Sequence, residues 1–282
     1  PVRIGNGAAE QTQLDVYGHL LDAVETWHDG VSEFESSERD FLRDAVDIAA
    51  RRWHESDHGI WEMRGEPRHF VHSKVMCWVA LDRGISLGAL LGADAEHVAS
   101  WRKVADELRE EVMHRGVDPG RGCFRQHYDT DEVDASLLKL PLVGFIDPKH
   151  PVMMATVSAI QHDLTVGHDG FIRRYARHVD DGIVGPSGSQ HDSDEGVFLV
   201  ASCWLVENLV LQDRYEEASA LFDRVATTSN DLDLFAEEFD VDSSSMLGNF
   251  PQAFTHLGML LAARRLHDGH GKPTRGTSSL RP

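Results

Sequence analysis

Helical periodicity constrains the fold of this 282-residue chain more than any other feature of its sequence. Apolar residues recur at intervals of three and four along most of the chain, which is the spacing that lines one face of an α-helix. No sustained alternation of apolar and polar residues occurs, and no Asn-Gly or Asp-Gly pair joins two alternating segments. The sequence therefore predicts an all-α protein.

The periodic segments predict about nine helices, of two kinds. They cover residues 14–27, 37–53, 73–91, 94–114, 136–145, 151–164, 195–211, 214–227 and 251–266. The segments 73–91, 195–211 and 251–266 are strongly apolar and are expected to be buried, whereas 94–114 and 214–227 carry a single apolar stripe. Ser37 to Asp40 resembles a capping box, so the second helix is expected to start near Ser37. Alternating inner and outer helices predict a toroid of helical hairpins.

Charge excludes two classes of partner. The chain has 47 Asp and Glu against 27 Lys and Arg, a net charge of −20, so nucleic acid and anionic membranes are not expected to bind. No stretch approaches the ~18–20 apolar residues of a membrane span, and the first residues do not resemble a signal peptide. We expect a cytoplasmic protein. The scarcity of Lys fits either a salt-rich cytosol or a GC-rich genome.

No pattern of metal or cofactor ligands occurs. The three cysteines, Cys77, Cys123 and Cys203, have no metal-ligand or disulfide spacing, and Cys77 and Cys203 are expected in the core. The 17 His are scattered without an HExxH motif, and neither a phosphate-binding glycine loop nor a GxSxG elbow is present. We therefore expect neither a metal nor a cofactor.

Long polar loops between the helices carry the candidate chemistry. They cover 54–69, 116–134, 178–195 and 230–249, and loops of this length are usually functional or disordered. In the first loop, Trp61 precedes Glu62. An indole face supports a sugar ring, and a desolvated carboxyl can hold a proton for a leaving oxygen. By spacing alone, a surface Glu beside a packing Trp is the simpler interpretation.

A second carboxylate pair, Glu237 and Glu238, lies between aromatic residues upstream of a buried helix. One acid and one base from distant parts of a chain are the minimum that glycoside hydrolysis requires. A solvated loop is the alternative. Asp134 and Glu195 each stand at the start of an apolar helix, where they either cap the helix or bind a sugar hydroxyl.

Five segments together resemble family 15 of the glycoside hydrolases, the glucoamylase-like family that also contains bacterial trehalases and glucodextranases. The resemblance extends to about His267. Its motifs are PVRIGN-x-A-x-x-Q-x-QLDVYG, GIWE-x-RGEPRHFVHSKVMCWVALDR, DASLL-x-LPLVGF, EG-x-FL-x-x-x-CW, and EE-x-D followed by LGNFPQAFTHLG.

The resemblance implies an (α/α)6 barrel and an inverting mechanism with two glutamates. The acid of the family follows a Trp, which matches Glu62, and its base is the first glutamate of an S/A-E-Q/E motif, which matches Glu237. A register slip to Glu238 stays open. The expected substrate-binding residues are Trp61, Arg64, His69, Asp134, Glu195 and His256. Residues 1–267 are expected to form a partial catalytic domain, and 268–282 a flexible tail.

The sequence departs from the family pattern at its start. About three of the twelve barrel helices, and the W-x-Y-R-x-C-W-x-R-D motif that holds the terminal glucose, have no counterpart. The chain is therefore expected to be a fragment, or to need a missing N-terminal segment or a partner chain, and to show weak or no activity alone.

The first functional hypothesis is an inverting hydrolase that releases glucose from the non-reducing end of α-glucans or oligosaccharides. An α,α-trehalase of the same family is the first alternative, and a non-catalytic toroid that binds sugar or a partner is the second. A terpene-cyclase-like toroid would need Asp-rich motifs on inner helices, but the nearest match, at 129–132, lies in a loop.

Overall fold

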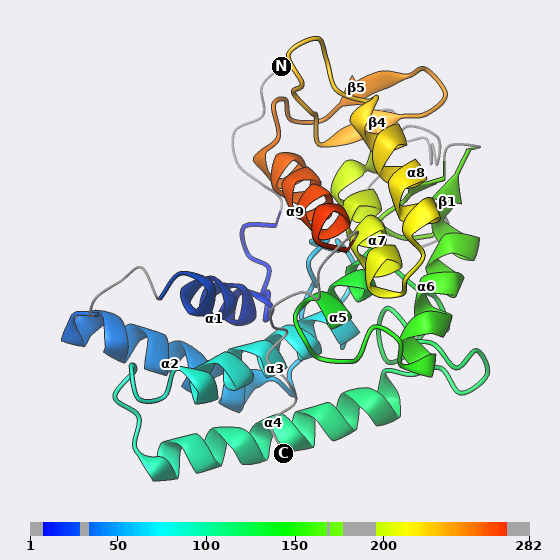
Figure 1. The fold of residues 1–282 in the computed structure, drawn as a ribbon. Coiled ribbons are helices and arrows are strands. Elements are labelled where there is room, and N and C mark those ends of the chain that lie inside the picture. Colours follow the sequence, from blue (N-terminus) through cyan, green and yellow to red (C-terminus); the bar gives the residue numbers. More distant parts are fainter. Residues whose placement is uncertain (1–7, 29–33, 168–169, 177–195, 270–282) are drawn as a thin grey trace. The chain divides into compact units, whose positions relative to one another are not determined.

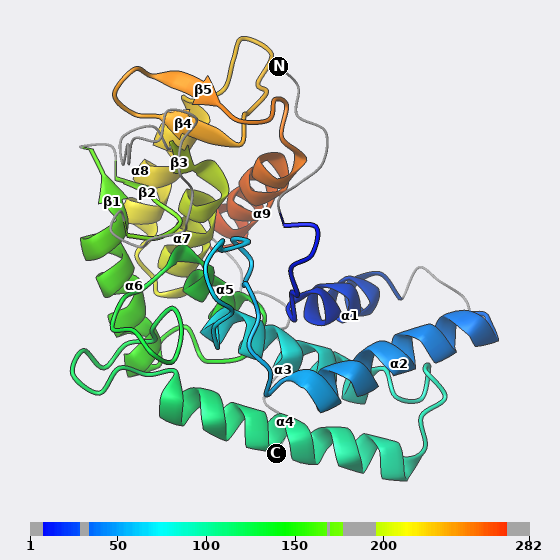
Figure 2. The same cartoon turned by 180° about the vertical axis from the view of Figure 1, so that it is seen from behind.

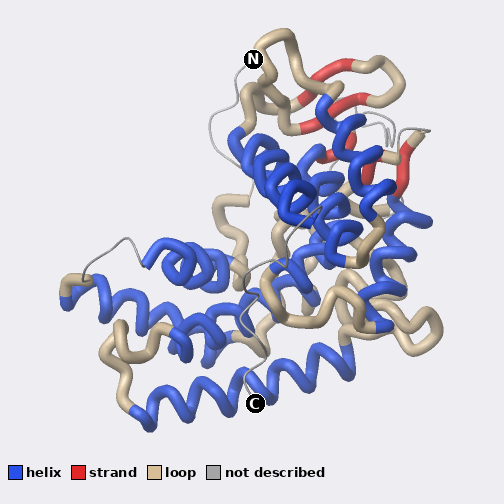
Figure 3. Tube along the Cα trace, in the orientation of Figure 1, coloured by secondary structure: helices blue, strands red, loops and turns tan. Residues whose placement is uncertain are grey.

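The structure is a computed structural model that describes residues 8–28, 34–167, 170–176 and 196–269. It is mostly helical, with a few very short strands (Figure 3). The chain divides into two compact units. The N-terminal unit comprises the described residues up to Asp118 together with Arg125–Asp131, and the C-terminal unit comprises Pro119–Phe124 and the described residues from Glu132 onward.

Four helices form the part of the N-terminal unit that the structure describes. They are α1 (Val16–Trp27), α2 (Ser36–Arg52), α3 (Val71–Ser86) and α4 (Ala95–Arg115) (Figure 1). Helix α3 packs against the other three, and it buries residues on nearly all sides, as its apolar sequence predicts. Helix α4 buries one stripe, including Trp101 and Leu108. Trp101 Nε1 also donates to Asp47 Oδ1 at 2.7 Å, which links α4 to α2.

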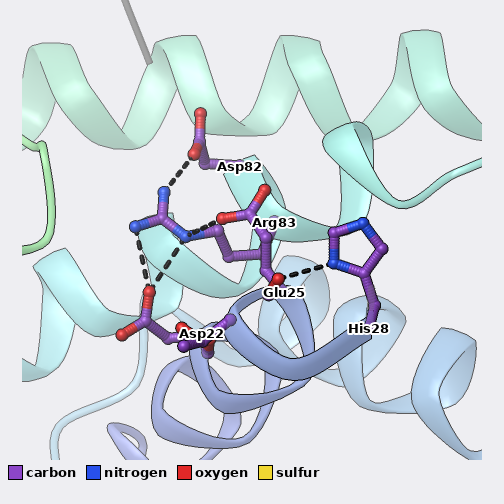
Figure 4. A network of polar contacts seen from close by, with 6 residues as sticks. Asp22, Glu25, His28, Asp82 and Arg83 are labelled. Carbon is purple, nitrogen blue, oxygen red and sulfur yellow. Dashed lines mark hydrogen bonds and ion pairs between the residues drawn. The ribbon is translucent and has the colours of Figure 1, made fainter. Parts of the chain in front are cut away.

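A buried arginine links α1 to α3. Arg83 of α3 lies 3.0 Å from Asp22 and 2.7 Å from Glu25, both on α1, and it also pairs with its neighbour Asp82 (Figure 4). The ring of His28 lies at the end of the same helix, with Nδ1 2.6 Å from the Glu25 carbonyl oxygen. Because the Arg83 side chain is only 13% exposed, these carboxylates neutralise a charge that is largely removed from water.

The C-terminal unit is built around α7 (Leu199–Leu211). Every α7 residue except Leu211 is buried, and the helix packs against α8 (Tyr215–Ala226) and α9 (Ala253–Gly269) (Figure 2). The 3₁₀ helix η2, α5 and α6 complete its helices, at Ala135–Leu138, Lys139–Leu142 and Pro151–Leu164.

In the described residues of the C-terminal unit, five short strands form two antiparallel sheets. They are β1 (Thr165–Val166), β2 (Phe171–Ile172), β3 (Val197–Phe198), β4 (Glu238–Asp240) and β5 (Ser245–Leu247). β1 pairs with β2, and β4 lies between β3 and β5, with Phe239 opposite both Val197 and Met246. The predicted loop 230–249 therefore contains a hairpin, whose strands are too short to produce a period-two pattern.

The predicted helices are confirmed to within a few residues, but some of their details are wrong. Helix α2 begins at Ser36, and its capping box joins Glu35 and Glu38, with Glu35 N donating to Glu38 Oε2 at 2.8 Å, two residues earlier than the predicted Ser37–Asp40 box. Phe41, expected on the buried stripe, is 62% exposed, because Leu42 and Val46 take that face.

Two further burial predictions differ from the structure. Trp27 is exposed, since it is the last residue of α1. Helix α9 was expected to be buried, yet only its Thr255, Gly258, Met259 and Ala262 face is. Its other side exposes apolar residues, namely Phe254, Leu257, Leu260 and Leu261, although the Phe254 ring also contacts Trp204 of α7.

Cys77 and Cys203 are buried, as predicted. Helix α9 continues to Gly269, two residues beyond the expected end of the domain at 267, and residues 270–282 lie outside the described ranges. Within those ranges, no helix combines the length and the apolar character needed to cross a membrane.

Candidate active site

Glu62 lies in a tight turn of the N-terminal unit, in the loop between α2 and α3. Its N–H donates to the Gly59 carbonyl oxygen at 3.1 Å, and the next amide, Met63 N–H, donates to the His58 carbonyl oxygen at 3.0 Å. Glu62 has a φ of 53°, a left-handed conformation that costs free energy for any residue with a Cβ. The surroundings of the turn must therefore hold it in place.

Residues 11–14 lie along this turn and bond to it at several points. The side-chain amide of Gln11 donates to the carbonyl oxygens of Glu62 and Met63 at 3.3 and 2.9 Å. His58 N donates to the Thr12 carbonyl oxygen at 3.1 Å. Gln13 Nε2 approaches the Gly59 carbonyl oxygen at 3.5 Å. The sequence motif Q-x-Q thus supports the loop that carries Glu62.

Two buried charged residues anchor the loop, one within the loop itself and one in α3. Asp57 is 1% exposed, and burial raises its pKa to about 6, although the bond from Leu14 N at 3.0 Å, Ser73 and the nearby Lys74 each act to lower it. Lys74 is also 1% exposed, and burial lowers its pKa. Its ammonium donates to the carbonyl oxygens of Trp53 and Glu55, which ties the end of α2 to α3.

Three predicted substrate-binding residues are on or near the Glu62 loop. Trp61 is half-buried next to Glu62, and Arg64 is exposed. His69 is half-buried and stacks on Tyr128, with ring centroids 5.7 Å apart. Burial, followed by the positive charges of Lys74 and Arg115, lowers the His69 pKa, so the neutral ring is favoured.

Glu237 lies in the C-terminal unit, immediately before β4. Its Oε2 accepts two N–H bonds from Asn249, one from the backbone at 3.0 Å and one from the side chain at 2.9 Å. Its backbone N–H donates to the Asn249 carbonyl oxygen at 3.0 Å. Gly248, with a φ of 74°, allows this approach, since a Cβ there would lie 2.8 Å from Glu237 Oε2. Asn249 thus fixes one oxygen of the half-buried carboxylate.

The neighbouring Glu238 has a different environment. It lies within β4, and its Oε2 accepts from Gly196 N at 3.1 Å, beside the β3–β4 pairing. This bond joins two segments that are far apart in the sequence. The geometry therefore gives Glu238 a structural contact and favours the register in which Glu237 is the functional residue.

The other predicted binding residues have diverse settings. Both ring nitrogens of His256 have backbone partners, the Gln252 carbonyl oxygen at 2.7 Å and Phe235 N at 3.4 Å, so His256 supports the segment that precedes Glu237. Asp134 is 1% exposed and accepts from Ser136 Oγ at 2.7 Å, but it makes no side-chain cap bond to the backbone of η2. Glu195 lies outside the described residues.

Three supporting residues were not identified as functional from the sequence: Gln11, Asp57 and Asn249. Gln11 and Asn249 fall inside quoted family motifs, so the signal was present, but their bonds are to residues brought close only by folding. Among the described residues, no group of three or more His, Cys, Asp or Glu side chains is arranged to hold a metal ion.

Solved glycosidases share this fold. A wild-type glycosidase has a TM-score of 0.73 and 22% identity, covering 90% of this chain and 67% of that chain. A bacterial glucoamylase complexed with acarbose has a TM-score of 0.72 and 12% identity, covering 91% of this chain and 41% of that one. The glucoamylase from Hypocrea jecorina has a TM-score of 0.59. The predicted class, all-α of the (α/α)6 type, is confirmed.

The sequence comparison defines the family. The model for glycosyl hydrolases family 15 matches residues 1–264, and the chain belongs to that family. Trehalase from Mycolicibacterium smegmatis is 42% identical over 263 residues, which are 93% of this chain and 38% of that protein. Trehalase from Thermoplasma volcanium is 37% identical over 274 residues, 97% of this chain and 42% of that protein. The chain thus spans about two fifths of these relatives.

Proposed function

We propose that this protein is an inverting glycoside hydrolase that cleaves trehalose into two glucose molecules, with Glu62 as general acid and Glu237 as general base. The observation that carries the proposal is the 42% identity to a trehalase over 93% of the chain. Release of glucose from α-glucans, the first hypothesis from sequence alone, becomes the alternative. The chain spans 38% of that trehalase, so the proposed activity is that of the whole protein.

Glu62 supplies the proton in this mechanism. Its protonated carboxyl donates to the glycosidic oxygen as the bond from that oxygen to C1 breaks, so the departing glucose leaves as a neutral alcohol. General-acid catalysis depends on direction as well as on protonation. The hydrogen-bonded left-handed turn supplies that direction, and Trp61, which precedes Glu62, offers an aromatic face for a sugar ring.

Glu237 activates the attacking water. Its ionised carboxylate takes one proton from the water, whose oxygen forms the new bond to C1 on the face opposite the departing glucose. Asn249 holds Oε2 with two N–H donors, which leaves Oε1 to receive the proton. The attacked ring then becomes β-glucose, while the departing ring keeps its α configuration. Return of the proton from Glu237 to Glu62 through solvent restores the starting state.

Proton NMR of the first turnovers tests the mechanism. Trehalose should give α- and β-glucose in equal initial amounts, whereas a retaining enzyme would give only α-glucose. Maltotriose, tested at the same concentration, should be cleaved at least tenfold more slowly. Faster cleavage of maltotriose would favour the α-glucan alternative, and only α-glucose from trehalose would exclude inversion.

Two isosteric variants test the residues. Glu62→Gln and Glu237→Gln should each lower kcat by about 10²–10⁴-fold, since general acid–base catalysis contributes that much. Glu238→Gln is the matched control, because its amide oxygen can still accept from Gly196 N, and it should retain activity within threefold. Loss of activity in Glu238→Gln with retention in Glu237→Gln would show that the register is wrong.

A further inference from the structure

The backbone of the proposed acid is held in a conformation that its own sequence does not favour. Glu62 has a φ of 53°. Glycine adopts this left-handed conformation without strain, whereas a residue with a Cβ adopts it only at a cost in free energy. The two bonds within the turn, Glu62 N to Gly59 O and Met63 N to His58 O, do not use the carbonyl oxygens of Glu62 and Met63. The partner of those two oxygens determines how firmly the turn is held.

Gln11 is that partner. One nitrogen, Nε2, donates to the Met63 carbonyl oxygen at 2.9 Å and to the Glu62 carbonyl oxygen at 3.3 Å. The orientation of the amide follows from these contacts, because a flipped amide would place its oxygen against two carbonyl oxygens. Since Nε2 bonds to both peptide units after the Glu62 Cα, it restrains the direction in which the Glu62 side chain leaves the backbone.

Gln11 is itself held independently of Glu62. Its N–H donates to the Ala8 carbonyl oxygen at 2.9 Å, and the segment is attached to α3 three residues later, where the Cys77 thiol lies 3.7 Å from the Leu14 carbonyl oxygen. Leu14 N also donates to the buried Asp57 carboxylate at 3.0 Å. The segment that carries the amide is therefore connected to α3 as well as to the loop that it restrains.

We propose that Gln11 is a positioning residue for Glu62: its side-chain amide holds the left-handed turn and so aims the acid at the glycosidic oxygen. This inference rests on the proposed function of Glu62 as general acid. Gln11 donates to backbone oxygens only and takes no part in proton transfer. Its loss should weaken protonation of the leaving group and leave the sugar-binding contacts unchanged.

The kinetic test uses two substrates that differ in their need for an acid. Trehalose has a sugar leaving group that must be protonated, whereas fluoride departs from α-glucosyl fluoride without protonation. Gln11→Met keeps the side-chain volume but removes both hydrogen bonds. It should lower kcat for trehalose about 10–100-fold with KM changed less than threefold, as expected for a misplaced catalytic group. Hydrolysis of α-glucosyl fluoride should fall less than threefold.

Gln212→Met is the matched control. Gln212 also donates its amide to a backbone carbonyl, that of Pro148 at 3.0 Å, but at the end of α7. It should leave both substrates unaffected. An equal fall on both substrates in Gln11→Met, or no fall on trehalose, would overturn the proposal. Glu62→Gln in the same assay distinguishes failure of this inference from failure of the proposed function. If Glu62→Gln cleaves trehalose normally, the proposed function itself is wrong.

Amide hydrogen exchange gives a second test that does not depend on turnover by the chain alone. Gln11→Met should accelerate exchange of the Glu62 and Met63 amides at least tenfold, since both are bonded within the restrained turn. The amides of α7 should be unaffected. Unchanged exchange at Glu62 and Met63 would mean that the turn is stable without Gln11, and the proposal would be rejected.

Discussion

The two proposed catalytic glutamates are held in contrasting ways. Glu62 is restrained through its backbone, by the turn and by Gln11. Glu237 is restrained through its carboxylate, which Asn249 fixes with two N–H donors. An acid must be aimed while it exchanges its proton, whereas a base can be fixed by one oxygen and act with the other. The contrast fits the roles that we propose.

Gly248→Ala tests the fixation of Glu237. The new Cβ would lie 2.8 Å from Glu237 Oε2, in a backbone conformation with a φ of 74°, so the variant should lose about 1–3 kcal/mol of stability and most of its activity. Gly122→Ala is the control, because its φ of 65° is similar but no atom lies within 4 Å of the added Cβ. Activity assays give kcat, and thermal melts give the change in stability. Equal effects of the two substitutions on kcat would contradict this account.

Asp57 should give the N-terminal unit a pH-dependent stability. Its pKa is about 6 in the folded chain, against roughly 3.9 in an unfolded one, so the folded state binds the proton more tightly. The stability linked to this proton is complete below about pH 4 and is lost as the pH rises through about 6, for a total of about 3 kcal/mol.

The variant Asp57→Asn cannot titrate, and its amide oxygen can still accept from Leu14 N. Its free energy of unfolding relative to the unmodified protein should therefore rise by up to about 3 kcal/mol between pH 4 and pH 7. Urea titrations at several pH values measure this difference. A difference that does not vary with pH would show that Asp57 does not titrate in that range.

At the scale of helices, burial follows composition where a helix is surrounded and departs from it where one side lacks a neighbour. Helices α7 and α9 are both apolar on most sides, yet α7 is buried on every side and α9 exposes Phe254 and Leu257. A periodic pattern identifies a helix and its apolar face. It does not identify the neighbours that cover that face.

Arg83→Ala should weaken the attachment of α1 to α3 in the N-terminal unit. The guanidinium is 13% exposed and bonds to Asp22 and Glu25 of α1, so its loss leaves these carboxylates together without a cation (Figure 4). The free energy of unfolding should fall by about 1–3 kcal/mol, less than for a fully buried pair, because the Asp22 and Glu25 side chains are 39% and 29% exposed. Thermal and denaturant unfolding measure the effect.

Arg264→Ala is the matched control on α9. Arg264 is 80% exposed and lies 3.7 Å from Asp268, so its removal should change stability by less than about 0.5 kcal/mol. A comparable loss in both variants would mean that arginine substitution acts through net charge, since each removes one positive charge from an acidic chain.

The whole molecule carries a net charge of −20, which opposes the compact state through repulsion among its carboxylates. Added salt screens this repulsion, and the Debye length falls to about 3 Å at 1 M. The melting temperature should therefore rise between 0.05 and 1 M KCl by several degrees, on the order of 5 °C.

Sucrose is the control for the effect of KCl on the melting temperature. Sucrose at matched osmolality stabilises proteins without screening charge, so the KCl curve should rise steeply below about 0.3 M and the sucrose curve should not. A melting temperature that is independent of KCl would show that the acidic residues are too far apart to repel one another.

The sequence by itself determined the helices and the fold class, because the helical period is a local property of a chain; it also supplied the two motif glutamates as candidates. Tertiary structure alone decided which carbonyl oxygens Gln11 reaches, which oxygen of Glu237 Asn249 fixes, and that the segment around 238–247 forms a hairpin beside β3. The side-chain bonds of Gln11 and Asn249 and the β3–β4 pairing join residues that lie between 12 and 52 positions apart. Only folding brings such residues together, and local composition carries no record of the pairing.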